Sequence, residues 1–177
     1  MPSRFAIGGA LSFRPMPDRT YTWHEPTPTA FASSDGLSLM KRMIAGELPQ
    51  PPITATLGFR LAEVDAGRAV FVGEAALWQY NPIGSVHGGV LATLLDSATG
   101  CAVHTRLPVG TGYTSLDLSA RFLRRVTTDS GTLTCVGEVV SMGRRTALAE
   151  ARLTDATGRL LAHGTSNCLV FPLTEGA

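Results

Sequence analysis

The stretch HGGVLATLLDSATGCAVHT, residues 87–105, decides the fold, because it is the only long helical candidate in the middle of the chain. Its apolar residues leave little room for a face in contact with water: Val90, Leu91, Ala92, Leu94, Leu95, Ala98, Cys101, Ala102 and Val103. A helix that is apolar almost all round is buried inside a protein. We therefore expect other elements to surround it, and a curled antiparallel sheet is the simplest cover.

Strand patterns lie on both sides of this helix. Before it, residues 53–64 and 69–77 are strand-like around the turn Asp65-Ala66-Gly67. After it, four more strand candidates follow, at residues 113–126, 131–142, 146–155 and 159–171. Short turn signals join these four segments, which predicts that they are consecutive antiparallel neighbours. The expected fold class is α+β.

Alternation is clearest in the segment 113–126, the first strand candidate after the helix. Leu116, Leu118, Ala120 and Phe122 are predicted to share one face, with Ser115 on the opposite face.

The N-terminal third is expected to differ from the rest. Residues 1–34 contain several prolines and no sustained periodicity, which predicts irregular structure. Asp35 can cap a short helix over about residues 36–47, before three further prolines. We interpret residues 1–47 as an N-terminal extension with a short helix, and residues 48–177 as a single folded domain.

Composition limits the classes of partner. Lys and Arg number 15 against 14 for Asp and Glu, so the net charge of +1 provides no electrostatic basis for binding nucleic acid or an anionic membrane. No stretch approaches the roughly 20 apolar residues of a membrane span. The three scattered cysteines indicate free thiols in a reducing compartment, and without a signal-peptide pattern we expect a cytoplasmic protein. The four histidines are too scattered to predict a metal site.

Gly88 and Gly89 open the buried helix, although each costs about 1 kcal/mol relative to alanine inside a helix. Glycine lets a ligand approach the backbone, and the free N–H groups of a helix N-terminus suit a developing oxyanion. A plain tight entry turn is the alternative reading of the pair.

Asp96 is an acidic residue inside an otherwise apolar helix, so its carboxylate must be solvated, paired or catalytic. Eight residues of helix separate it from Gly88 by about 12 Å. The two groups of one chain are therefore too far apart to contact the same carbonyl group. If both act on one substrate, two subunits must build the site.

The pattern Asn81, Gly84, His87-Gly88-Gly89 and Asp96 resembles that of the PaaI-like acyl-CoA thioesterases of the hot-dog superfamily. The resemblance continues through residues 112–118 and 143–165 and covers roughly residues 48–171, which makes it far more specific than His-Gly-Gly alone. It implies the hot-dog fold, an antiparallel sheet wrapped round one long buried central helix. Arg124-Arg125 departs from the family, which often has an Arg-Pro pair there.

The resemblance also implies a role for each residue of the pattern. The Gly88 N–H would polarise the thioester carbonyl, and Asp96 of the facing subunit would be the nucleophile or the general base. Asn81 would position the carbonyl or the water, Ser115 would orient that water, and His87 would hold the loop or assist the departing thiolate.

Substrate binding is expected at further positions. Gly89 would lie against the substrate, and the arginine pairs Arg124-Arg125 and Arg144-Arg145 could bind the phosphates of coenzyme A, although strand-end arginines are more often solvated. No cofactor is needed, since coenzyme A is part of the substrate.

Hydrolysis of an aromatic or medium-chain acyl-CoA is the function that these residues favour. A non-catalytic acyl-CoA-binding protein and a hot-dog hydratase or dehydratase are the alternatives. Asp96 argues against the first, and the absence of a second histidine between His87 and His104 argues against the other. The small-molecule acyl-CoA is the expected partner, together with a second copy of the chain, because the composite site requires a dimer. Dimers of this fold commonly pair again into tetramers.

Overall fold

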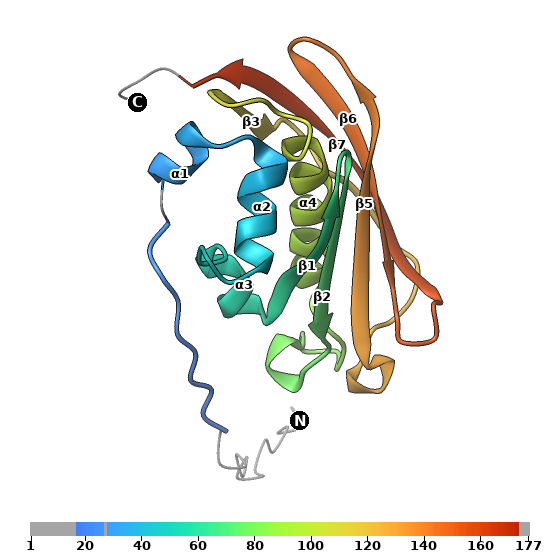
Figure 1. The fold of residues 1–177 in the computed structure, drawn as a ribbon. Helices are drawn as coiled ribbons and strands as arrows, with labels where there is room; N and C mark the ends of the chain where they lie inside the picture. Colours follow the sequence, from blue (N-terminus) through green and yellow to red (C-terminus); the bar gives the residue numbers. More distant parts are fainter. Residues whose placement is uncertain (1–16, 27, 174–177) are drawn as a thin grey trace, which may run out of the picture.

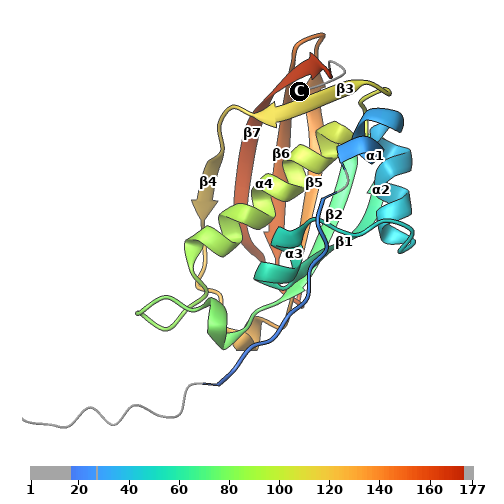
Figure 2. The same ribbon diagram turned by 90° about the vertical axis from the view of Figure 1, so that its left-hand side faces the viewer.

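The computed structural model describes residues 17–26 and 28–173, and within them a seven-stranded antiparallel sheet curls round the helix α4 (Gly88–His104) (Figures 1 and 2). Along the sheet the order is β1, β2, β5, β6, β7 and β3, and β4 also pairs with β7. This is the expected α+β hot-dog arrangement. The strands are β1 (Phe59–Asp65), β2 (Arg68–Glu74), β3 (Thr111–Ser115), β4 (Ser119–Phe122), β5 (Thr132–Met142), β6 (Thr146–Thr154) and β7 (Leu160–Pro172).

The central helix is buried, as its apolar surface predicts. Leu94, Leu95 and Ala98 are at most 1% exposed and belong to the main hydrophobic core between the helix and the sheet. Gly137 of β5 lets the two layers approach closely, because a Cβ atom there would clash with the carbonyl of Ala98. The structure thus confirms the element from which the fold was inferred.

Residues 53–57 are helical, and the predicted strand over this segment is wrong. Helix α3 (Pro52–Leu57) begins with a proline in its first turn, where the missing N–H is harmless, and ends at Gly58. Gly58 has a φ of 72°, the left-handed conformation of many helix C-termini, so the strand starts only at Phe59. The second strand also ends early, at Glu74, and the 3-10 helix η1 (Leu77–Gln79) follows.

The predicted order of the later strands is wrong in one place. The segment 113–126 does not lie beside residues 131–142: β3 and β4 both pair with β7, while β5 pairs with β2 and β6. Turn signals show only which segments follow each other closely along the chain. The strand beside β5 is β2, which belongs to the hairpin before the helix.

The segment 113–126 is also split into two strands, β3 and β4. Leu116 is 58% exposed, although Leu118 and Ala120 pack against the core, so the predicted shared face is wrong at Leu116.

Helices cover the side of α4 that the sheet leaves open near its C-terminal end (Figure 2). Helix α2 (Gly36–Ile44) is capped by Asp35, whose side chain accepts a hydrogen bond from Ser38 N, as predicted, but it ends before residue 47. Its first residue docks on the chain after α4, since Gly36 N donates to Leu107 O at 3.0 Å.

Residues 17–26 lack helix and strand, as expected, whereas α1 (Pro28–Ser33) is helical where irregular structure was predicted. Residues 1–16 and 27 of this segment lie outside the described residues. None of the helices in the described ranges has the length and apolarity needed to cross a membrane.

Candidate active site

The loop before α4 is folded around the side chain of Asn81. Its Oδ1 accepts hydrogen bonds from the N–H groups of Ile83 (3.1 Å) and Ser85 (3.2 Å), and its Nδ2 donates to Ser85 Oγ at 3.1 Å. A β-bridge between Tyr80 and Val86 closes the loop. Asn81 therefore sets the shape of the turn that leads the chain into the helix.

His87 caps the N-terminus of α4. Its Nδ1 accepts the N–H of Gly89 at 2.9 Å, and its own N–H donates to Gln79 O at 2.8 Å. Because Nδ1 is an acceptor, the proton of the neutral imidazole lies on Nε2. The cap uses the Gly89 N–H and leaves the Gly88 N–H without an acceptor among residues 17–26 and 28–173. A helix N-terminus with a free N–H is suited to a partly negative oxygen.

A cleft of about 560 Å³ opens at Gly88. It brings together four of the predicted site residues, Asn81, Gly88, Arg124 and Arg125. The ring of Phe122 lies against Gly88, at 3.2 Å from the place where a Cβ atom would stand. The lining is mostly apolar and consists of Asn81, Ile83, Ser85, Val86, Gly88, Leu91, Phe122, Leu123, Arg124, Arg125 and Val126.

Both arginines of the cleft are fixed by main-chain carbonyls. A guanidinium nitrogen of Arg124 donates to Leu160 O at 2.6 Å, and one of Arg125 donates to Gly84 O at 2.6 Å. Each guanidinium carries five N–H donors, so one such bond leaves others for a ligand. The two cations are thus held in place while their outer donors remain available.

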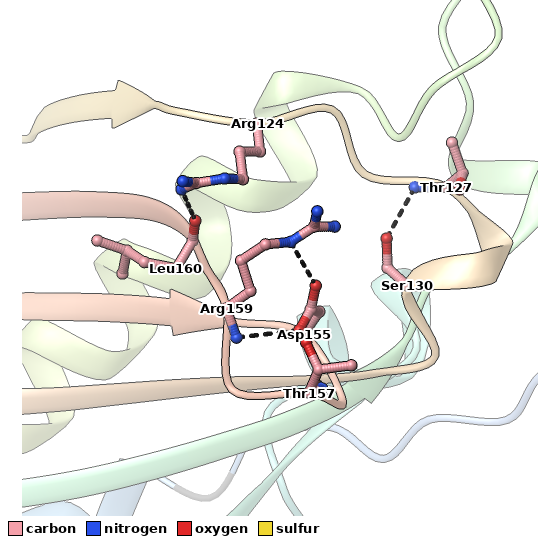
Figure 3. Close-up of polar contacts among 7 residues, drawn as sticks. All are labelled: Arg124, Thr127, Ser130, Asp155, Thr157, Arg159 and Leu160. Atoms are coloured by element: carbon pink, nitrogen blue, oxygen red, sulfur yellow. Dashed lines mark hydrogen bonds and ion pairs between the residues drawn. The ribbon is translucent and has the colours of Figure 1, made fainter.

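The turn before β7 positions the Leu160 carbonyl that binds Arg124 (Figure 3). The buried carboxylate of Asp155 accepts hydrogen bonds from the hydroxyl and N–H of Thr157 and from the N–H and guanidinium of Arg159, at 2.6 to 3.0 Å. These bonds, the Thr157 hydroxyl first, lower the pKa of Asp155 to about 2. The rigid turn ends at Leu160, whose carbonyl holds Arg124.

Asp96 and Ser115 form a second group of predicted site residues. The hydroxyl of Ser115, at the end of β3, donates to Asp96 Oδ1 at 2.9 Å, and the Asp96 carboxylate is half-buried in the middle of α4. Desolvation, with the charge of Asp96 adding to it, raises the pKa of the Cys101 thiol to about 12. Cys101 is therefore an unreactive thiol beside the carboxylate.

Gly88 and Asp96 stand on the same helix, about 12 Å apart along its axis. The second arginine pair, Arg144 and Arg145, lines a separate groove of about 340 Å³ beside β3 and β7. The structure thus divides the predicted residues of one chain among the cleft, the Asp96–Ser115 pair and this groove. In the described part of the chain, no three His, Cys, Asp or Glu side chains are grouped as metal ligands would be.

Several residues that line the cleft were not predicted as site residues. Ile83 and Ser85 lie inside the Asn81–His87 loop, and their position there was the available signal. Phe122 and Leu123 carried no such signal, because a period-two pattern does not show which residue of β4 meets the start of α4.

Comparison with known proteins identifies the family. The sequence pattern of the Thioesterase superfamily matches residues 83–162. A phenylacetic acid degradation-related protein from Ralstonia eutropha JMP134 is 32% identical, with a TM-score of 0.67, over 73% of this chain and 98% of its own. The chain belongs to the thioesterase superfamily. It is an acyl-CoA thioesterase with the PaaI-like hot-dog fold, as predicted.

Two further proteins are similar to this chain. The 1,4-dihydroxy-2-naphthoyl-CoA hydrolase of Listeria monocytogenes is 27% identical over 115 residues, which are 65% of this chain and 90% of that protein. The PaaI protein of the Escherichia coli phenylacetic acid degradation operon has a TM-score of 0.67 over 80% of this chain and 99% of its own. At 21% identity, this last similarity concerns the fold alone.

Proposed function

We propose that this thioesterase hydrolyses an aromatic or medium-chain acyl-CoA to the free acid and coenzyme A, with Asp96 as nucleophile or general base. The observation that carries the proposal is the half-buried Asp96 carboxylate in an apolar helix, bonded to the Ser115 hydroxyl at 2.9 Å. An acidic residue within an otherwise apolar helix must be solvated, paired or catalytic, and a catalytic role accounts for its place there.

In the proposed mechanism the thioester carbonyl oxygen accepts the free N–H of Gly88. One such donor contributes roughly 3 to 4 kcal/mol to the transition state. As a general base, Asp96 takes a proton from water while the water oxygen attacks the carbonyl carbon; as a nucleophile, its oxygen attacks first and water then hydrolyses the anhydride. In either case the carbon–sulfur bond breaks, and the coenzyme A thiolate leaves with the bonding pair and takes up a proton.

Ser115 would orient the carboxylate or the water, while Asn81 would act by shaping the loop and His87 by capping the helix. The proposed roles of Asn81 and His87 are supported by their bonds within the loop.

Two subunits would build each site, because Gly88 and Asp96 of one chain lie about 12 Å apart along α4. The sheet edge formed by β3 and β4 supports a dimer. Leu116, Phe122 and Leu123 are each more than 50% exposed there, and exposed apolar patches of this kind often mark interfaces. A pairing of two dimers into a tetramer would be a further step.

Coenzyme A would bind along the cleft at Gly88, with its phosphates near Arg124 and Arg125. Guanidinium groups bind phosphates with two parallel hydrogen bonds, and both side chains keep free donors there. Gly89 would lie beside the bound thioester. The separate groove at Arg144 and Arg145 would contribute only if the dimer brings it to a cleft. The aromatic acyl choice is supported by the Listeria relative, whose name specifies a naphthoyl-CoA.

Release of free coenzyme A thiol from a panel of aliphatic and aromatic acyl-CoAs tests the proposal. Asp96→Asn should lower the rate on the best substrate by orders of magnitude, while acyl-CoA binding and the oligomer are retained. Asn81→Ala is the matched comparison and should cost less, because its expected role is indirect. Wild-type turnover in Asp96→Asn would refute the role of Asp96. No release from any acyl-CoA, with tight binding retained, would favour a non-catalytic acyl-CoA-binding protein.

A further inference from the structure

The chain between β3 and β4 has one residue more than the segment of β7 that it faces. Ser115 pairs with Cys168 of β7, and Ser119 pairs with Thr165. Residues 116–118 therefore face only two residues of β7. Such a mismatch is a β-bulge, a feature that re-aims side chains and is frequent next to active sites.

The bulge changes which side chains face the central helix. Leu118, just before β4, and Ala120 within β4 pack on the core, so even-numbered residues of this stretch point inward. Without the bulge the same alternation would bring Leu116 inward, and a leucine offers no donor to the Asp96 carboxylate. With the bulge Leu116 is exposed, and the preceding Ser115 hydroxyl meets Asp96 Oδ1 at 2.9 Å.

Hydrogen bonds from β7 hold the bulge at Asp117. Asp117 Oδ1 accepts the N–H of Asn167 at 3.1 Å, and Oδ2 accepts its Nδ2 at 2.9 Å. The Asp117 carbonyl accepts the Ser166 hydroxyl at 2.7 Å, and Leu116 N donates to Asn167 O at 2.8 Å. The two donors of Asn167, its side chain first, lower the pKa of Asp117.

We infer that Asp117 is a positioning residue for hydrolysis: the Asp117–Asn167 pair holds the bulge that aims the Ser115 hydroxyl at Asp96. This inference rests on the proposed role of Asp96. Asp117 acts through Ser115, so its loss lowers the turnover number kcat and leaves the Michaelis constant KM nearly unchanged.

A double-mutant cycle on the full-length oligomer tests the inference, with kcat and KM measured on the best acyl-CoA. Asp117→Ala should lower kcat about as much as Ser115→Ala, on the order of 10- to 100-fold. In the Ser115→Ala background, Asp117→Ala should cause no further loss, because the two residues act as one unit.

Two more variants keep the test decisive if Asp117→Ala folds poorly. Asn167→Ala loses only the side-chain bond and should lower kcat by less. The exchange Asp117→Asn with Asn167→Asp keeps the bond from the main-chain N–H of residue 167 and reverses donor and acceptor in the side-chain bond, and should return kcat to within about threefold of wild type.

Wild-type kcat in Asp117→Ala would overturn the inference, as would multiplicative losses in the double mutant. Dissociation of the oligomer in Asp117→Ala, measured by analytical ultracentrifugation, would also overturn it, since the residue would then act on assembly. Failure of the proposed function has a different result, wild-type turnover in Asp96→Asn, which is measured in the same assay.

Discussion

The first two N–H groups of α4, those of Gly88 and Gly89, differ in their surroundings. No acceptor for the Gly88 N–H is present in the described part of the chain, and the Phe122 ring lies beside the same residue. His87 occupies the next N–H, that of Gly89, with its own ring. The chain thus presents one donor to the cleft and satisfies the adjacent donor.

Gly88→Ala should lower kcat/KM for acyl-CoA hydrolysis by about 10-fold or more, because the new methyl group lies 3.2 Å from the Phe122 ring and crowds the approach of the thioester to the N–H. The double variant Gly88→Ala, Phe122→Leu removes the ring and should recover part of the loss. Full activity of Gly88→Ala would show that the N–H is not used by the substrate. Thermal unfolding of each variant controls for loss of fold.

The helices and strands that could be predicted are those whose pattern is local in the sequence. Helix α4 was predictable because almost all of its surface is apolar, and the cap at Asp35 because its spacing to Ser38 is local. Helix α3 was not, since its six residues are too few for periodicity to separate helix from strand.

The candidate site was also predictable only where its residues lie close together in the sequence. The resemblance in the loop and helix pointed to Asn81, His87, Gly88 and Asp96, and the structure shows how the loop is built. The bulge before β4 was hidden, because its evidence is the register of β7, some 50 residues away in the chain. A shift of one residue in a strand reverses every side chain, and one sequence does not record it.

Arg19, in the segment 17–26, contacts helix α3 and the 3-10 helix η1. The Arg19 guanidinium donates to Ala55 O and Thr56 O at 2.7 and 2.9 Å, and it stacks on the Trp78 ring at 3.7 Å. Trp78 precedes Gln79, whose carbonyl accepts the N–H of the helix cap His87. The contact of Arg19 with Trp78 is therefore one residue away from the hydrogen bond that holds His87 at the cleft.

Arg19→Ala should increase hydrogen exchange in residues 77–87, with little effect on β5 to β7, because only the anchor of this segment is lost. Arg19→Lys is the matched control. It keeps the charge but not the planar guanidinium, so it should restore protection from exchange only in part. Unchanged protection of residues 77–87 in Arg19→Ala would contradict the anchoring role. The measurement is exchange followed by mass spectrometry at neutral pH.

For the whole molecule, the lowered pKa values of His104 and Asp155 make the free energy of unfolding depend on pH. His104 at the end of α4 is 4% exposed, and burial lowers its pKa from 6.5 to about 4. The folded state therefore favours the neutral imidazole, and the unfolded chain binds the proton first. Asp155 is ionised in the fold down to about pH 2, against 3.8 for an ordinary carboxyl, so its bonds are lost only in stronger acid.

The sign follows from proton linkage. The stability that His104 contributes is complete above about pH 6.5 and is lost as the pH falls toward 4, whereas that of Asp155 is lost below about 3.8. We expect the free energy of unfolding, measured by urea titration from pH 7.5 to 4.5, to fall more steeply for the wild type than for His104→Phe. Asp155→Asn should keep the wild-type slope in this window, because its carboxylate titrates below it. Parallel curves for the wild type and His104→Phe would show that the pKa of His104 is the same in the folded and the unfolded chain, and would contradict the effect of burial.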